Sequence, residues 1–224
     1  MNKSIIYLIA FTLPLISLSQ EKWSILPDEF ILSGNRTFVE GEGRFGFGAG
    51  MYHAFLKGHR LSIIPGLEYN RTACFYDYEY NDKWSHNEDV TYHFNYLTIP
   101  IGLRVNFGKK INIFLESGGF VDFPLYTKTQ GTNYYAFPVF DEDSVYIESG
   151  QEVFDRKISS NTSVGVYFGG GVIIPSSKVD WIIKADYKYG LTETFEPGYN
   201  SDKSRYVRFM LGVRLWHRKY LFNE

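Results

Sequence analysis

Few ionisable side chains in this sequence have the types and spacing that catalysis or metal binding requires. The five histidines share no metal-ligand spacing; they are His53, His59, His86, His93 and His217. Neither a CxxC nor an HExxH motif occurs, and Cys74 is the sole cysteine. We therefore expect no catalytic centre, no metal site and no cofactor.

Ten charged residues stand out because they lie within segments that otherwise alternate between apolar and small polar residues. They are Arg44, Glu68, Arg104, Glu116, Asp122, Lys184, Asp186, Lys188, Arg208 and Arg214. Charges of both signs can form salt bridges if they are buried together, and an unpaired buried charge is costly. They could instead line a path for protons or ions. The choice depends on the elements that position them.

The N-terminal segment predicts export from the cytoplasm. Lys3 supplies a short basic region, an apolar run extends over 5–16, and Ser17 and Ser19 are small residues before a predicted cleavage site. Residues 1–19 are therefore expected to be a signal peptide, and residues 20–224 a single domain. No later stretch approaches the roughly 18 consecutive apolar residues of a membrane-spanning helix.

The rest of the chain alternates between predicted strands and turns. The strands cover 43–56, 60–76, 91–107, 111–127, 160–174, 179–194 and 205–218, with a weaker one within 23–38. The connections at 57–59, 108–110 and 175–178 are tight, whereas those at about 77–90, 128–159 and 195–204 are long. Long strands joined by short turns on one side and long loops on the other are typical of bacterial outer-membrane barrels. We predict an all-β fold, a single eight-stranded antiparallel transmembrane β-barrel.

Alternation leaves open which face of the strands lies inside. Ile113 and Leu115 share one face of their segment, while Glu116 and Asp122 share the other. Glycines gather on the polar face; they are Gly46, Gly48, Gly50, Gly66, Gly102, Gly118, Gly165, Gly169, Gly171, Gly190 and Gly212. Glycine weakens a water-facing strand, whereas a narrow lumen needs small residues beside large polar ones. We therefore place the polar face inside and the apolar face against lipid.

The ten charged residues then line the lumen. We expect them to form a salt-bridge plug, because the interior of an eight-stranded barrel is just filled by side chains. The same parity turns Tyr92, Phe94 and Tyr96 inward. Either these aromatic residues cap the lumen, or a β-bulge between Tyr96 and Pro100 switches the parity.

Several short motifs resemble, in order, the PorT-like outer-membrane barrel family of Bacteroidetes. Residues 94–104 (FNYLTIPIGLR) are similar to its Y-L-x-I-P strand, and residues 116–120 (ESGGF) to its next, Gly-rich strand. Residues 166–172, 187–191 and 207–215 resemble its later strands. The resemblance implies a barrel in the outer membrane but little about activity, since a fold does not fix a function. One branch of the family assists type IX secretion.

The leading functional expectation is a non-enzymatic barrel that acts as a scaffold or through its extracellular loops, with 128–159 as the contact surface. The alternatives are a secretion accessory of the PorT kind, a narrow pore, and an enzyme that modifies lipid A. His93, near the outer rim with Thr91 and Asn95 beside it, is the candidate for such an enzyme, although nothing completes a triad. The acidic stretch 76–95 could bind Ca²⁺ or a partner, but we expect a solvated loop.

Several partners follow from an outer-membrane location. We expect outer-membrane lipid and lipopolysaccharide, the barrel-assembly machinery, and a protein that contacts the loops. The formal net charge is −2, which provides no field that would attract nucleic acid.

Overall fold

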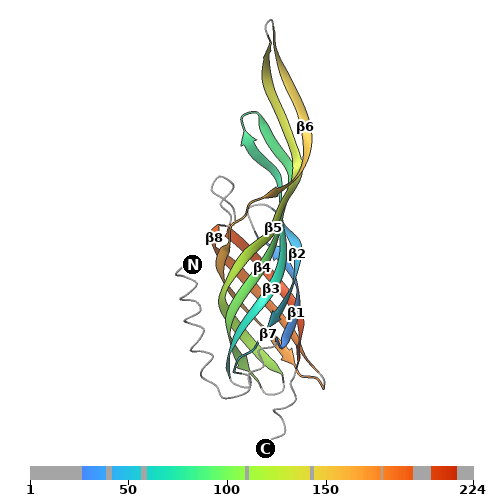
Figure 1. Ribbon diagram of the computed structural model, residues 1–224. Coiled ribbons are helices and arrows are strands. Elements are labelled where there is room, and N and C mark those ends of the chain that lie inside the picture. Colours follow the sequence, from blue (N-terminus) through green and yellow to red (C-terminus); the bar gives the residue numbers. More distant parts are fainter. Residues whose placement is uncertain are drawn as a thin grey trace, which may run out of the picture.

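The computed structural model is an antiparallel β-barrel from which a long hairpin rises at one end (Figure 1). It describes residues 27–38, 42–56, 60–108, 111–141, 144–177, 179–193 and 203–215. The predicted signal peptide, the turn at 57–59 and most of the loop predicted at 195–204 lie outside the described residues. No helix within the described ranges is long and apolar enough to cross a membrane.

Nine strands make up the described part of the chain. They are β1 (Glu29–Thr37), β2 (Glu42–Tyr52), β3 (Leu61–Asp82), β4 (Ser85–Phe107), β5 (Asn112–Asp141), β6 (Ser144–Ile158), β7 (Ser163–Ile174), β8 (Val179–Glu193) and β9 (Lys203–Leu215). Each pairs antiparallel with its neighbours in one sheet. The weak first strand expected within 23–38 is β1.

Eight of these strands close a ring. β9 pairs back with β1, where Leu211 lies opposite Leu32, and β4 and β5 pair along most of their length. β7 continues the ring on the other edge of β5, opposite residues 112–122. β6 pairs with β5 alone, beyond Thr127, and so lies outside the ring. The predicted eight-stranded barrel is confirmed, with β6 as an addition to it.

The outer surface of the ring is apolar. Side chains such as Leu32 (70% exposed), Ile101 (58%), Phe168 (61%) and Phe209 (70%) project from different strands. An apolar surface of this extent is foreign to a water-soluble monomer but is what the hydrocarbon of a bilayer requires. The polar face is therefore the interior, as the sequence predicts.

The glycines of the inner face leave room for large inward-pointing side chains. A Cβ at Gly102 would lie 2.0 Å from the hydroxyl oxygen of Tyr167, and a Cβ at Gly66 would lie 2.3 Å from the ring of Tyr52. Neither contact is sterically possible. The ring thus accommodates tyrosines because glycine stands opposite them.

The prediction of loops at 77–90 and 128–159 is wrong, because both segments are β-hairpins. β3 and β4 stay paired as far as Asp82 and Ser85, and β5 and β6 as far as Asp141 and Ser144. Beyond the bilayer neither face of a strand needs to be apolar. The alternation that identifies the membrane strands therefore fades although the pairing continues.

Tyr92, Phe94 and Tyr96 cap the lumen, the first of the two alternatives. Their exposed fractions are 5%, 6% and 1%, and the ring centroids of Phe94 and Tyr96 are 6.0 Å apart and nearly parallel. β4 keeps its parity through Pro100. The β-bulge lies on the neighbouring strand instead, where Leu125 is the extra residue opposite the Asn95–Tyr96 step.

Because β6 lies outside the ring, shortening the hairpin is expected to leave the barrel folded. We predict that replacing residues 132–153 by Asn-Gly preserves the faster migration of unheated protein on SDS gels. The variant keeps Phe154, which packs on the cap. Migration at the unfolded position without heating would contradict the assignment of β6.

Candidate functional site

A chain of ion pairs with alternating sign runs through the lumen. Its order is Arg214, Glu29, Arg104, Glu116, Lys184, Asp186, Arg208, Glu68 and Lys188. The members come from β1, β3, β4, β5, β8 and β9, so the chain links strands on all sides of the ring. Each buried charge thereby has an opposite charge beside it, which burial requires.

Arg104 is the central residue of the lower half of this chain. Its Nη1 lies 2.7 Å from Glu29 Oε1, and its Nη2 lies 2.8 Å from Glu116 Oε2. The guanidinium carbon stands 4.4 Å from the ring centroid of Phe114, which belongs to an apolar cluster in the lumen. Arg104 is 1% exposed, so its charge is compensated by these groups and not by water.

Arg208 is the central residue of the upper half of the ion-pair chain. It binds Asp186 through two parallel hydrogen bonds of 2.8 and 2.6 Å, from Nε and Nη2, and reaches Glu68 through Nη1 at 2.6 Å. Lys188 Nζ lies 2.8 Å from the same carboxylate of Glu68. A bidentate guanidinium–carboxylate pair fixes direction as well as distance, so this part of the lumen is rigidly packed.

Nine of the ten predicted lumen residues lie in the lumen. Asp122 is among them, but it accepts a hydrogen bond from Thr98 Oγ1 and forms no ion pair with any residue that the structure describes. Arg44 is the exception. A register shift between Arg44 and Phe47 turns its side chain to the outer surface, where the guanidinium carbon lies 4.2 Å from the ring centroid of Phe75. A bulge of this kind leaves no clear sign in the alternation.

Sequence reasoning missed Glu29, which binds two arginines and is fully buried. Pro27 and Gly34 obscured the first strand. The signal was nevertheless present, because Glu29 shares its parity with Ile31 and Asn35, whereas Phe30 and Leu32 point outward.

The second distinctive region is the hairpin of β5 and β6. Its base rests on an apolar cluster formed by Cys74, Val90, Tyr92, Phe94 and Tyr96, against which Phe154 and Ile158 pack. Beyond that base the side chains of Phe140 (76% exposed), Ile147 (71%) and Val153 (79%) lie largely on the surface. The hairpin is anchored at one end and exposed at the other.

The acidic stretch 76–95 is the β3–β4 hairpin and not a solvated loop. Glu79 accepts hydrogen bonds from Tyr92 Oη (2.7 Å) and Asn87 Nδ2 (3.2 Å). At the turn, the backbone N–H of Trp84 holds the pKa of Asp82 below its usual range. The described side chains include no group of three or more His, Cys, Asp or Glu placed to hold a metal ion.

Fold and lumen together define a membrane β-barrel of the outer-membrane type. The chain belongs to the outer membrane protein beta-barrel domain family, whose model matches residues 29–196. This confirms, at the level of that family, the barrel class that the motifs predict. No curated protein matches.

Among solved structures, the chain is similar to the neisserial surface protein A NspA, with 13% identity, coverage of 84% of this chain and 94% of that one, and a TM-score of 0.48. It is also similar to the attachment invasion locus protein Ail of Yersinia pestis, with 12% identity, coverage of 85% and 99%, and a TM-score of 0.38. The N-terminal β-barrel domain of Pseudomonas aeruginosa OprF gives 12% identity, coverage of 84% and 97%, and a TM-score of 0.36.

The ion-pair chain makes a prediction about stability. Replacing Arg208 by Met should destabilise the folded barrel by about 3 kcal/mol, because Asp186 and Glu68 lose their shared cation in a buried position. Replacing Arg214 by Met should cost less, because Arg214 is 15% exposed at the end of the chain and Glu29 keeps Arg104 as a partner. Urea unfolding in lipid vesicles measures both. Equal losses would contradict the account.

Proposed function

We propose that this protein is a non-enzymatic outer-membrane barrel that displays the β5–β6 hairpin as a binding surface for another protein. In this proposal the ion-pair chain fills the lumen and holds the barrel rigid beneath the hairpin. The observation that carries the proposal is the free edge of β6, together with the exposed apolar side chains on the hairpin.

β6 pairs on one side only. Its partner β5 covers one edge over 15 residues, and the other edge has no partner strand in the described part of the chain. Long unpaired edges invite pairing with another strand, and proteins normally cover or shorten them. An extended segment of a second protein could add a strand here through backbone hydrogen bonds.

The side chains of β6 suit such a partner. Ile147 and Val153 would offer apolar contacts, while Glu148 and Glu152 are exposed carboxylates that discourage indiscriminate association. We expect a partner segment that is extended, partly apolar and positively charged.

A narrow pore is less well supported. Arg104, Lys188, Glu68 and Glu116 are at most 2% exposed and stand within the lumen in hydrogen-bonded pairs. An ion would have to displace these groups to pass.

A lipid-modifying enzyme is also less well supported. His93 lies in a hollow whose other polar groups are cationic, amide or phenolic, since they belong to Arg71, Lys128, Asn95, Gln130 and two tyrosines. The nearby carboxylate of Asp155 is paired with Lys128 at 2.7 Å, and the residues that line the hollow include no serine, threonine or cysteine. A triad needs such a nucleophile beside the histidine.

The motifs that resemble those of the PorT-like family support a secretion accessory as the second candidate. It would use the same exposed hairpin, with a secretion component as partner. Deletion of the gene would then leave exported cargo in the periplasm, whereas a surface binding protein would leave export intact.

Site-specific crosslinking tests the binding surface. A photo-crosslinking residue placed at Ile147 or at Val153 should give, in intact cells, an adduct with one and the same protein. The matched control is Phe209, which is equally exposed but faces lipid, and no protein adduct is expected there. Absence of an adduct from both hairpin positions would refute the proposal.

Planar bilayers test the filled lumen. The purified barrel should produce no steps in current. A porin measured under the same conditions serves as the conducting control. Regular single-channel steps from the wild-type protein would refute this part of the proposal.

A further inference from the structure

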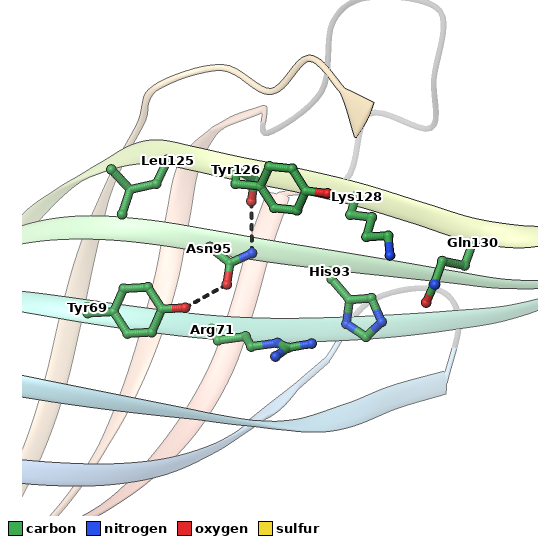
Figure 2. A pocket seen from close by; sticks show the side chains of 8 residues that line it. All are labelled: Tyr69, Arg71, His93, Asn95, Leu125, Tyr126, Lys128 and Gln130. Carbon is green, nitrogen blue, oxygen red and sulfur yellow. Dashed lines mark hydrogen bonds between the residues drawn. The ribbon is translucent and has the colours of Figure 1, made fainter. Parts of the chain in front are cut away.

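A basic hollow of about 410 Å³ opens on the outer surface of the barrel between β3, β4 and β5 (Figure 2). The side chains that matter for its chemistry are Tyr69, Arg71, His93, Asn95, Tyr126 and Lys128. It lies just beyond the point where the outward residues of these strands change from apolar to polar. On β4 that change falls between Leu97 and Asn95, and on β5 it follows Leu125.

The β-bulge in β5 builds this hollow. Below Leu125 the odd-numbered residues of β5 face outward, as Phe123 does. The extra residue reverses the parity, so that Tyr126 and Lys128 face outward beside Asn95 and His93. Without the bulge these two side chains would point into the lumen.

Hydrogen bonds fix one wall of the hollow. Tyr69 Oη donates to Asn95 Oδ1 at 2.7 Å, and Asn95 Nδ2 donates to the carbonyl oxygen of Tyr126 at 3.0 Å. Figure 2 shows these two bonds in line across three strands. The phenol of Tyr69 and the backbone of β5 at Tyr126 are therefore held in place before any ligand arrives.

Positive charge exceeds negative charge around the hollow. Arg71 has no carboxylate partner in the described part of the chain; its guanidinium carbon lies 5.9 Å from the ring centroid of Phe47. Lys128 Nζ is paired with Asp155 at 2.7 Å, and Lys157 Nζ lies 5.2 Å from the ring centroid of Tyr126. The three cations Arg71, Lys128 and Lys157 thus have one carboxylate, that of Asp155, among them.

Charge is also sorted along the hairpin. At its base, next to the barrel, Lys128, Arg156 and Lys157 outnumber Asp155, whereas Glu148 and Glu152 lie further along β6. Basic groups at the level of lipid headgroups and acidic groups beyond it match a membrane surface that carries phosphate.

We propose that the hollow binds a phosphate group on the sugar headgroup of an outer-leaflet lipid. Arg71 offers the planar fork that suits phosphate oxygens, and Lys128 supplies a second charge from the opposite side. The ring of Tyr126, 38% exposed, would lie against the sugar. A soluble sugar phosphate presents the same chemistry, but it would gain nothing from the apolar band directly below.

His93 provides a reporter inside the hollow. Its Nδ1 is buried and has no hydrogen-bond partner in the described structure. Burial lowers the pKa of His93, and the positive charges of Arg71, Lys128 and Arg44 lower it further. Among the described residues of β6, Asp155 is the carboxylate whose charge interacts with His93. A bound phosphate adds negative charge, so it should raise the pKa of His93.

The test compares three forms of the full-length protein in neutral detergent by native mass spectrometry. The forms are the wild type, Arg71→Gln/Lys128→Gln, and the control Arg36→Gln/Arg205→Gln. The control removes the same charge from two outward-facing arginines on β1 and β9, away from the hollow. The probes are lipid A, enzymatically dephosphorylated lipid A, and glucosamine 1-phosphate.

The wild type and the control should each retain one lipid A molecule. The affinity of the Arg71→Gln/Lys128→Gln variant for lipid A should be at least about tenfold lower than that of the wild type, since each cation near a phosphate surface adds substantially to binding. Equal binding by all three forms, or equal binding of dephosphorylated lipid A, would overturn the proposal. Glucosamine 1-phosphate that binds as tightly as lipid A would overturn the lipid as the source of the phosphate.

A second measurement needs no variant. In the NMR spectrum of wild-type protein, lipid A should shift the titration of His93 to higher pH, and dephosphorylated lipid A should leave it in place. An unchanged titration in the presence of bound lipid A would place the lipid elsewhere and overturn the proposal.

Discussion

Every charge inside this narrow ring must have an opposite charge beside it, and most other features of the protein follow from that requirement. Eight strands enclose only enough space for side chains, and the outward positions must be apolar because they face hydrocarbon. Polar side chains of the membrane strands must therefore point inward. In the lumen they lose contact with water and must bind one another. The chain of ion pairs meets that demand across the ring. Each charged residue within the chain contacts two residues of opposite charge, as Arg104 contacts Glu29 and Glu116.

The same alternation explains what happens above the bilayer. Where lipid no longer dictates the outer face, β5 takes an extra residue at Leu125 and its parity reverses. At this level the inner face of β4 carries the stacked cap that ends the lumen, while the outer face of β5 carries Tyr126 and Lys128. β5 continues beyond the ring and acquires β6 as a partner. One local irregularity thus accompanies three features: the cap, the basic hollow and the projecting hairpin.

The ring strands and the inner face could be predicted from sequence because lipid imposes a period of two on every membrane strand. Nine of ten lumen charges follow from that period. Arg44 and the bulge at Leu125 could not be predicted, since a register shift depends on how two strands pair and changes no residue type. For the two hairpins the sequence pattern predicts loops, because strands outside lipid need no alternation. The basic hollow brings together residues of three strands, which no local pattern reveals.

We expect the lumen charges to act as one coupled network. A double-mutant cycle on Arg104 and Glu116 tests it most directly, with Arg104→Met, Glu116→Leu and the double variant unfolded by urea in lipid vesicles. A coupled pair should give an interaction free energy of about 2 kcal/mol, the double variant being more stable than the sum of the single losses implies. Additive losses, with an interaction free energy near zero, would contradict the account.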